Sequence, residues 1–268
     1  MIGVFDSGVG GLTVLNHLLV DHPQYNYIYL GDSANVPYGN KSSEVIYGYS
    51  KKAVDFLYSK GCKLIIVACN SASAQALRRL QQEYLPEKYP ELKVLGVIRP
   101  IVEKITSIKN IKKVGIIGTK ATTNSNIYID EISPIRPDIK IYQKATPLLV
   151  PLIEEGWAKK PETKMILKKY LRELKMKQVE SLVLACTHYP FLLADIKRIM
   201  GKNCLIFDPG EVISEKLGDY ISRHPEIKLK TSKKGKCFFY ATDNLEGFAN
   251  SGLFFLGKKL DNLEKIDL

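Results

Sequence analysis

Two short stretches of the sequence place a cysteine directly after an apolar run. Residues 66–73 read IVACNSAS and residues 183–190 read VLACTHYP. In both, Ala-Cys ends the apolar run and a small polar residue follows. A thiol in this position is either a buried structural group or a general acid or base, which works best with a pKa near the working pH. The repeated context of Cys69 and Cys186 favours a shared chemical role.

Two thiols on opposite sides of one cleft suit proton transfer at carbon. One removes a proton while the other delivers a proton to the opposite face, which inverts a stereocentre without a metal or a cofactor. Cys186 with the nearby His188 would alone favour a hydrolase or transferase with a covalent intermediate. Residues so close in one turn seldom bring a ring nitrogen onto the sulfur, and the second thiol would be surplus. We therefore favour the two-thiol reaction.

Short β-rich runs alternate with longer helical patterns, such as 44–59, 72–83 and 191–200, which predicts α/β units with parallel sheets covered by helices. Two series of runs resemble each other, and each cysteine follows the third run of its series. We expect two similar three-layer α/β halves with the active site in the cleft between them. The first domain is predicted to span residues 1–98 plus 209–268, and the second 99–208. The predicted strands are Ile2–Phe5, Tyr27–Leu30, Leu64–Ala68, Val94–Val97, Val114–Ile117, Ile139–Tyr142, Leu182–Ala185, Leu205–Phe207 and Cys237–Ala241.

Polar side chains are expected at the carboxyl ends of these strands, where ligands bind in open parallel sheets. They are small hydroxyls, an amide, carboxylates and the two thiols, with no large apolar group, which suits a small charged substrate and not a nucleotide. The dipoles of the helices that follow are expected to lower the pKa of each thiol. The strand-end residues are Asp6, Ser7, Asp32, Ser33, Cys69, Asn70, Ser71, Thr119, Thr122, Thr123, Thr146, Cys186, Thr187, His188 and Asp208.

Other common classes of site are not indicated. The GVGG turn at 8–11 has Thr13 where a dinucleotide fingerprint needs glycine, and no lysine follows as in a phosphate-binding loop. The five cysteines include no CxxC pair, which argues against a disulfide framework or a structural zinc site. We expect neither a metal nor a cofactor.

The charge balance raises the question of nucleic acid. Thirty-nine basic against 28 acidic residues leave +11, and residues 159–177 alone hold 8 basic and 2 acidic residues. Apolar residues recur there at helical spacing (Met165, Ile166, Leu167, Tyr170, Leu171, Leu174), so we interpret the lysines as the solvated face of an amphipathic helix. The sequence has no apolar run long enough for a membrane and no secretion signal at its start, so a cytoplasmic protein is expected.

Six segments in order resemble the glutamate racemases, cofactor-independent enzymes of the aspartate/glutamate racemase superfamily, over essentially the full chain. They are FDSGVGGLTVL (5–15), GDSANVPYG (31–39), ACNSASA (68–74), IGTKATTNS (117–125), PLIEEG (151–156) and ACTHYPFL (185–192). The chain departs from the family at Ser71, where threonine is commoner, and at Arg99, where an acidic or apolar residue is commoner.

The resemblance implies that Cys69 takes the Cα proton of D-glutamate and Cys186 that of L-glutamate. Asp6 would assist Cys69, His188 would assist Cys186, and Glu154 would be a further acidic helper. It also implies a homodimer that supplies D-glutamate for peptidoglycan. The implied substrate contacts are Asp6, Ser7, Tyr38, Gly39, Asn70, Ser71, Thr187 and His188, with Asp32, Ser33, Thr119 and Thr122 as additions.

Three alternatives remain open at this point. A racemase of aspartate or a related acid would use the same thiols, and a substrate panel would separate it. A binding protein would use the basic helix on nucleic acid or a protein partner, with salt-dependent binding. A thiol hydrolase would need only one of the two cysteines and would accumulate a covalent adduct.

Overall fold

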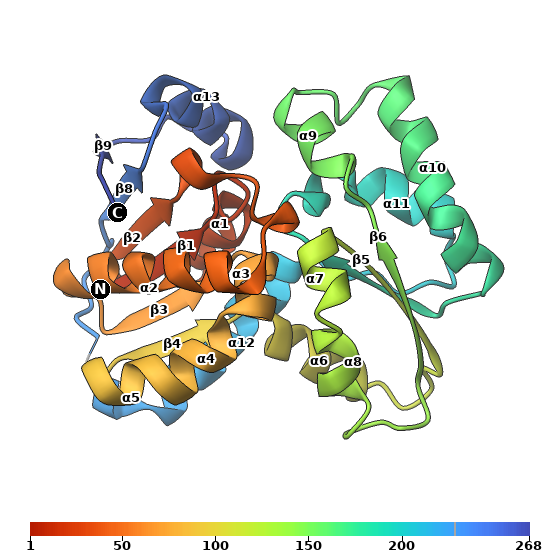
Figure 1. Ribbon diagram of the computed structural model, residues 1–268, viewed down its shortest axis with the longest axis horizontal. Helices are drawn as coiled ribbons and strands as arrows, with labels where there is room; N and C mark the ends of the chain where they lie inside the picture. The colour runs from red at the N-terminus through yellow and green to blue at the C-terminus, as the bar shows by residue number, and fades with distance from the viewer. Residues whose placement is uncertain (228) are drawn as a thin grey trace.

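The computed structural model of the protein describes residues 1–227 and 229–268, which form two parallel β-sheets (Figure 1). The six-stranded sheet has the order β4-β3-β1-β2-β8-β9 and the three-stranded sheet the order β6-β5-β7. The strands are β1 (Ile2–Asp6), β2 (Tyr27–Gly31), β3 (Leu64–Val67), β4 (Lys93–Gly96), β5 (Lys113–Gly118), β6 (Lys140–Ala145), β7 (Ser181–Ala185), β8 (Cys237–Ala241) and β9 (Leu263–Lys265).

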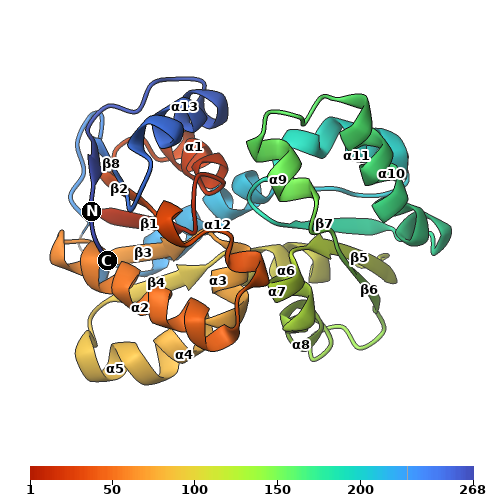
Figure 2. The same cartoon turned by 45° about the horizontal axis from the view of Figure 1, so that its top comes forward.

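Helices cover both faces of each sheet, as the two views show (Figures 1 and 2). The α-helices are α1 (Leu12–Asp21), α2 (Ser43–Ser59), α3 (Asn70–Gln75), α4 (Leu77–Arg79), α5 (Leu85–Lys88), α6 (Ile98–Thr106), α7 (Lys120–Asn124), α8 (Ile127–Ile132), α9 (Leu149–Glu154), α10 (Pro161–Met176), α11 (Leu193–Met200), α12 (Pro209–Arg223) and α13 (Leu245–Leu256). Shorter helical turns are η1 (Ser33–Asn35), η2 (Tyr38–Asn40), the π-helical η3 (Leu80–Tyr84), η4 (Tyr189–Leu192) and η5 (Pro225–Ile227).

The predicted α/β architecture with two similar halves is confirmed. Strands β2-β1-β3 and β6-β5-β7 have the same order and direction, because in each sheet the first strand lies between the second and the third. We call the six-stranded sheet with α1–α5, α12 and α13 the first unit, and the three-stranded sheet with α6–α11 the second unit. The domain boundaries near residues 98 and 209 stay a prediction.

Alternating burial along the strands explains the layers. In β1, Ile2 and Val4 pack on the side of α1, whereas Phe5 packs on the side of α2. In the second unit, one face of the sheet packs on α6 and α8, and the other packs on α9 and α10. Successive side chains of a strand point to opposite faces of the sheet. Because both faces are buried, each strand contributes side chains to two separate hydrophobic cores.

Two predicted elements differ from the structure. Leu205–Phe207 is not a strand: Leu205 makes only an isolated parallel bridge to Ser181 and is 43% exposed. Asp208 and Pro209 already begin α12 there, which ends extended pairing. The single helix predicted over 72–83 is divided into α3, α4 and η3, since Ala76 leaves helical geometry.

The basic helix predicted over 159–177 is α10. Leu167, Leu171 and Leu174 are buried as expected, and the lysines lie outward. Met165 is 67% exposed, so its place on the apolar face was wrong. No helix in the described parts of the chain is long and apolar enough to cross a membrane.

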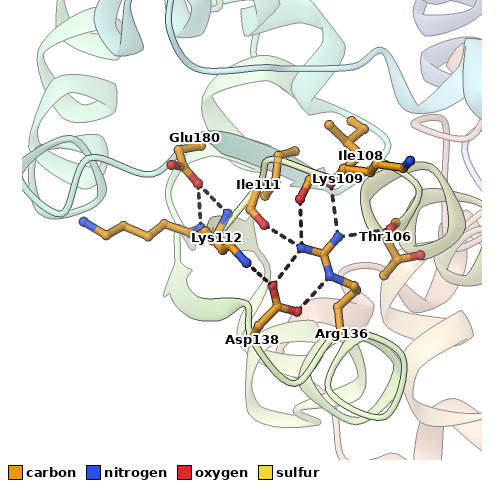
Figure 3. A network of polar contacts seen from close by, with 9 residues as sticks. Thr106, Ile108, Lys109, Ile111, Lys112, Arg136, Asp138 and Glu180 are labelled. Carbon is orange, nitrogen blue, oxygen red and sulfur yellow. Dashed lines mark hydrogen bonds and ion pairs between the residues drawn. The ribbon is translucent and has the colours of Figure 1, made fainter.

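A polar network ties together the amino ends of the second sheet (Figure 3). The Arg136 guanidinium pairs with Asp138 and donates to the carbonyls of Thr106, Ile108, Lys109 and Ile111. Glu180 accepts from two backbone N–H groups at the start of β5. These contacts satisfy backbone groups of the loops at the amino ends of the strands, the edge opposite to their carboxyl ends.

Candidate active site

A pocket of about 230 Å³ lies where the carboxyl ends of the two sheets face each other. This volume is below the roughly 300–1,000 Å³ typical of drug-sized ligands, which fits a small substrate. Eleven of the predicted site residues line it: Ser7, Tyr38, Gly39, Cys69, Asn70, Ser71, Thr119, Glu154, Cys186, Thr187 and His188.

Four predicted residues do not line this pocket. Asp6 is buried at the end of β1, and Thr122 is buried with its hydroxyl 3.2 Å from that of Thr119. Asp32 is fully buried behind the pocket wall, where it accepts hydrogen bonds from the Tyr38 hydroxyl at 2.6 Å and from Thr242 at 2.9 Å. Ser33 instead exchanges two hydrogen bonds with the backbone of Asp243. Asp32 therefore acts on the pocket through Tyr38, whereas the structure does not bring Ser33 to it.

The Cys69 thiol has a carboxylate as its charged neighbour. It follows β3 as the N-cap of α3, is 6% exposed, and lies 3.5 Å from the Ser7 hydroxyl. Burial and the charge of Asp6 raise the pKa of Cys69 to about 12. The expected lowering by the helix dipole is therefore wrong for Cys69, because α3 has only six residues and burial outweighs its end.

Asp6 is itself an unusual group. Its Oδ2 accepts a hydrogen bond from the Gly8 N–H at 3.0 Å, but its buried Oδ1 has no hydrogen-bond partner among the described residues. Burial raises the pKa of Asp6, partly offset by His188 and by backbone donors. A carboxyl group with a raised pKa and a free oxygen can hold or release a proton next to Cys69.

The Cys186 thiol has an imidazole as its neighbour. His188 Nδ1 lies 3.8 Å from the Cys186 sulfur, and His188 Nε2 lies 3.0 Å from Glu154 Oε1. Burial lowers the pKa of His188, but the hydrogen bonds to Cys186 and Glu154 outweigh it and raise this pKa to about 10. The expectation that a histidine two residues away would miss the sulfur is wrong. A protonated imidazole here stabilises negative charge on sulfur.

A glycine of the first unit gives the His188 ring its space. A Cβ at Gly10 would lie 2.4 Å from His188 Cε1 and 2.4 Å from the Thr187 hydroxyl. A side-chain carbon does not approach another atom so closely, so position 10 must be glycine to leave room for the His188 ring. This steric need explains the glycine without a bound phosphate. Gly10 of the GVGG turn therefore belongs to the site, although the turn is no nucleotide fingerprint.

Hydrogen bonds join the two units around the pocket. The Thr13 hydroxyl donates to the Thr187 carbonyl at 2.9 Å, and the Tyr128 hydroxyl donates to Asn70 Oδ1 at 3.1 Å. The hydroxyls of Ser71 and Thr119 lie 2.8 Å apart. These contacts fix the distance between the walls that carry the two thiols.

The pocket is more apolar than the sequence predicted. Val36, Pro37, Pro147, Val150 and Pro151 also line it, because loops and α9 contribute as well as strand ends. Thr146, which was expected at a strand end, lines it too, as does Lys120, which the sequence analysis did not name. Lys120 directly follows Thr119, so extending that strand end by one residue would have found it.

In residues 1–227 and 229–268, no group of three or more His, Cys, Asp or Glu side chains is arranged to hold a metal ion. The chemistry available at the pocket is that of thiols, an imidazole, carboxyl groups and hydroxyls.

A racemase family model and a curated racemase both match this chain. A family model described as Asp/Glu/Hydantoin racemase matches residues 9–217. A glutamate racemase of Geobacter metallireducens is 39% identical over 100% of this chain and 96% of its own length.

Solved structures agree with this family. A glutamate racemase isoform of Bacillus anthracis superimposes with a TM-score of 0.93 at 30% identity, covering 100% of this chain and 97% of that one. A glutamate racemase of Francisella tularensis, solved with D-glutamate, has a TM-score of 0.90 at 34% identity, covering 99% and 97%.

Proposed function

The chain belongs to the Asp/Glu/hydantoin racemase family, and we propose that it is a glutamate racemase, an isomerase that interconverts L- and D-glutamate. The observation that carries the mechanism is the pair of buried thiols, Cys69 and Cys186, at equivalent strand ends and on the walls of one small pocket. That arrangement supports proton removal and delivery on opposite faces of the substrate Cα.

In the L-to-D direction, Cys186 as a thiolate takes the Cα proton and the Cys69 thiol donates its own proton to the opposite face. The raised pKa of Cys69 keeps that thiol protonated at neutral pH, as an acid requires. The protonated His188, held by Glu154, stabilises the Cys186 thiolate. In the reverse direction Cys69 gives its proton to Asp6 and becomes the base.

The two carboxylates of glutamate need donors, which the pocket offers. The hydroxyls of Ser7, Ser71, Thr119 and Thr187 and the Asn70 amide line it. Lys120, an exposed residue, also belongs to the lining. Several neutral donors can share one carboxylate, and each then makes a charge-assisted hydrogen bond to it.

The known role of this family is to supply D-glutamate for peptidoglycan, and we extend it to this chain together with a homodimeric state. All five cysteines are free, as expected of a reducing cytoplasm. The two units would be domains, 1–98 with 209–268 and 99–208.

The test is incubation of the enzyme with D- and L-glutamate in D2O, without added cofactor, followed by circular dichroism and proton NMR. We expect loss of the optical signal from both enantiomers with deuterium entering Cα. Exchange with aspartate but not glutamate would move the substrate and keep the two-thiol reaction. No exchange with either would refute the racemase proposal, and the Cys69→Ala/Cys186→Ala double variant is the blank.

A further inference from the structure

The His188 ring is contacted by an aromatic side chain from the C-terminal part of the chain. Phe255 on α13 places its ring centroid 5.6 Å from that of His188, with the two planes at 88°. Both side chains are buried, with Phe255 7% and His188 5% exposed. The contact joins α13 of the first unit to the histidine that serves the thiol of the second.

We propose that Phe255 is a positioning residue that holds the His188 imidazole in line between Cys186 and Glu154. This inference rests on the proposed function, in which His188 assists Cys186. Phe255 has no polar atom and does not line the pocket, so it acts only through the histidine.

The geometry of His188 explains why a positioning residue is needed. Its hydrogen bonds to Cys186 and Glu154 engage the two ring nitrogens, which lie on either side of Cε1. Two bonds of this kind leave the ring free to tilt about the line that joins the nitrogens. Gly10 approaches Cε1, and the perpendicular Phe255 ring supplies a second wall that limits the tilt.

Phe255 is in turn fixed by the segment that carries His188. Its ring lies 4.6 Å from that of Phe191, three residues after His188, at an angle of 65°. The ring of Phe254 stacks on that of Phe191, with the centroids 4.7 Å apart and the planes at 14°. Perpendicular and offset arrangements are those that aromatic rings prefer. Phe255 thus contacts two residues of the segment at once, whereas Phe254 packs on Phe191 and, at 5.4 Å, on Phe255, and is 48% exposed.

Helix α13 lies far along the chain from the motifs that carry the two thiols. The family model matches residues 9–217 and so excludes Leu245–Leu256, although the Geobacter relative aligns over the whole chain. The apolar run Leu253–Leu256 reads in sequence as an ordinary helix face. Only the fold brings one of its four side chains against the histidine.

The test uses Phe255→Ala, Phe255→Leu and the matched control Phe254→Ala. Racemisation kinetics should show kcat about tenfold lower in Phe255→Ala with KM changed less than twofold. Phe255→Leu, which keeps part of the volume, should fall between Phe255→Ala and the unchanged protein. Phe254→Ala should stay within twofold. Equal kcat in Phe255→Ala and the unchanged protein, or equal losses in Phe254→Ala and Phe255→Ala, would overturn the proposal.

A second readout does not depend on racemisation. Alkylation of each thiol by iodoacetamide, followed by peptide mass spectrometry, gives the rate at Cys186 relative to Cys69 in the same molecules. A displaced His188 stabilises the Cys186 thiolate less, so this ratio should fall about tenfold in Phe255→Ala and stay unchanged in Phe254→Ala. An unchanged ratio in Phe255→Ala refutes the positioning role. Because the ratio needs no turnover, it separates this failure from a failure of the racemase assignment.

Discussion

The surroundings of Cys69 and Cys186 differ in charge although their backbone frames match. Each thiol ends the third strand of the same three-strand arrangement, and each is 6% exposed. Cys69 has the Asp6 carboxyl and the Ser7 hydroxyl near it, whereas Cys186 has an imidazole held by Glu154. Duplicated topology thus supplies two facing thiols, and unlike neighbours make one an acid while the other can be a base.

The largest expected effect comes from the thiols themselves. Cys69→Ala and Cys186→Ala should each lower kcat for racemisation by about 10³-fold or more, since each removes one of two required proton carriers. Circular dichroism of glutamate measures the loss, and thermal unfolding checks the fold. Full activity in either single variant would show that one thiol suffices. The different surroundings of Cys69 and Cys186 would then not reflect separate roles in proton transfer.

The same variants sharpen the comparison in D2O. Cys69→Ala retains the Cys186 side, so it should exchange the Cα proton of L-glutamate without inversion, and Cys186→Ala should do so with D-glutamate. Proton NMR measures the exchange. Exchange of the opposite enantiomer in each variant would reverse the assignment of the thiols to the two faces.

The charged neighbours should give the next largest losses. Asp6→Asn and His188→Asn should each lower kcat about 10²-fold, because each removes the group that exchanges protons with its thiol or stabilises it. They differ in one respect: the Asp6 charge raises the pKa of Cys69, so Asp6→Asn should lower that pKa. Ultraviolet absorbance of the thiolate during a pH titration measures this shift, with His188→Asn as the comparison variant.

Gly10→Ala tests the contact between the two sides directly. The added methyl would collide with the His188 ring, so we expect roughly tenfold lower kcat from a change that touches neither thiol. Gly48→Ala is the matched control, since nothing lies within 4 Å of a Cβ at Gly48. Equal activities of the two variants would mean that the turn moves away without cost to the histidine.

The smallest effect is a shift in pH dependence. The hydrogen bond to Glu154 raises the pKa of His188, so Glu154→Gln should move the alkaline limb of kcat/KM from near pH 10 to lower pH. The contribution of protonated His188 to the free energy of unfolding is complete below its ordinary pKa of about 6.5. It is lost as the pH rises through about 10, the raised pKa in the folded protein. Glu155→Gln, at the exposed neighbouring position, should leave the limb in place. Coincident profiles for both variants would contradict the role of Glu154.

Much of the frame was predictable because it depends on local patterns. Apolar runs located eight of the nine proposed strands, and the repeated Ala-Cys pointed to both thiols. Short, weakly patterned elements such as β9 were missed, and Leu205–Phe207 was taken for a strand. In that segment the N-cap Asp208 and Pro209 begin α12, so strand pairing stops after the single bridge between Leu205 and Ser181.

The roles of polar residues were harder to predict because distant residues decide them. Asp32 and Ser33 end a strand as expected, but Thr242 and Asp243 hydrogen-bond to them from 210 positions along the chain. The pKa of Cys69 depends on total burial, which no local spacing reveals. Pocket lining by Val36 and Val150 likewise arises from loops and α9 that only the fold brings together.

The pairing of β2 with β8 has a consequence for synthesis. β8 leaves the ribosome only after the whole second unit, so the edge of β2 stays unpaired during most of translation. An unpaired edge strand is a place where chains associate wrongly. The Thr242 hydroxyl donates a hydrogen bond to Asp32, which in turn accepts one from Tyr38. The Thr242 bond can form only after β8 and the residues that follow it have been synthesised. Nascent chains arrested before residue 237 should therefore be cut by protease near residues 31–40, whereas released chains should resist, so the pocket is completed only when the last strands arrive.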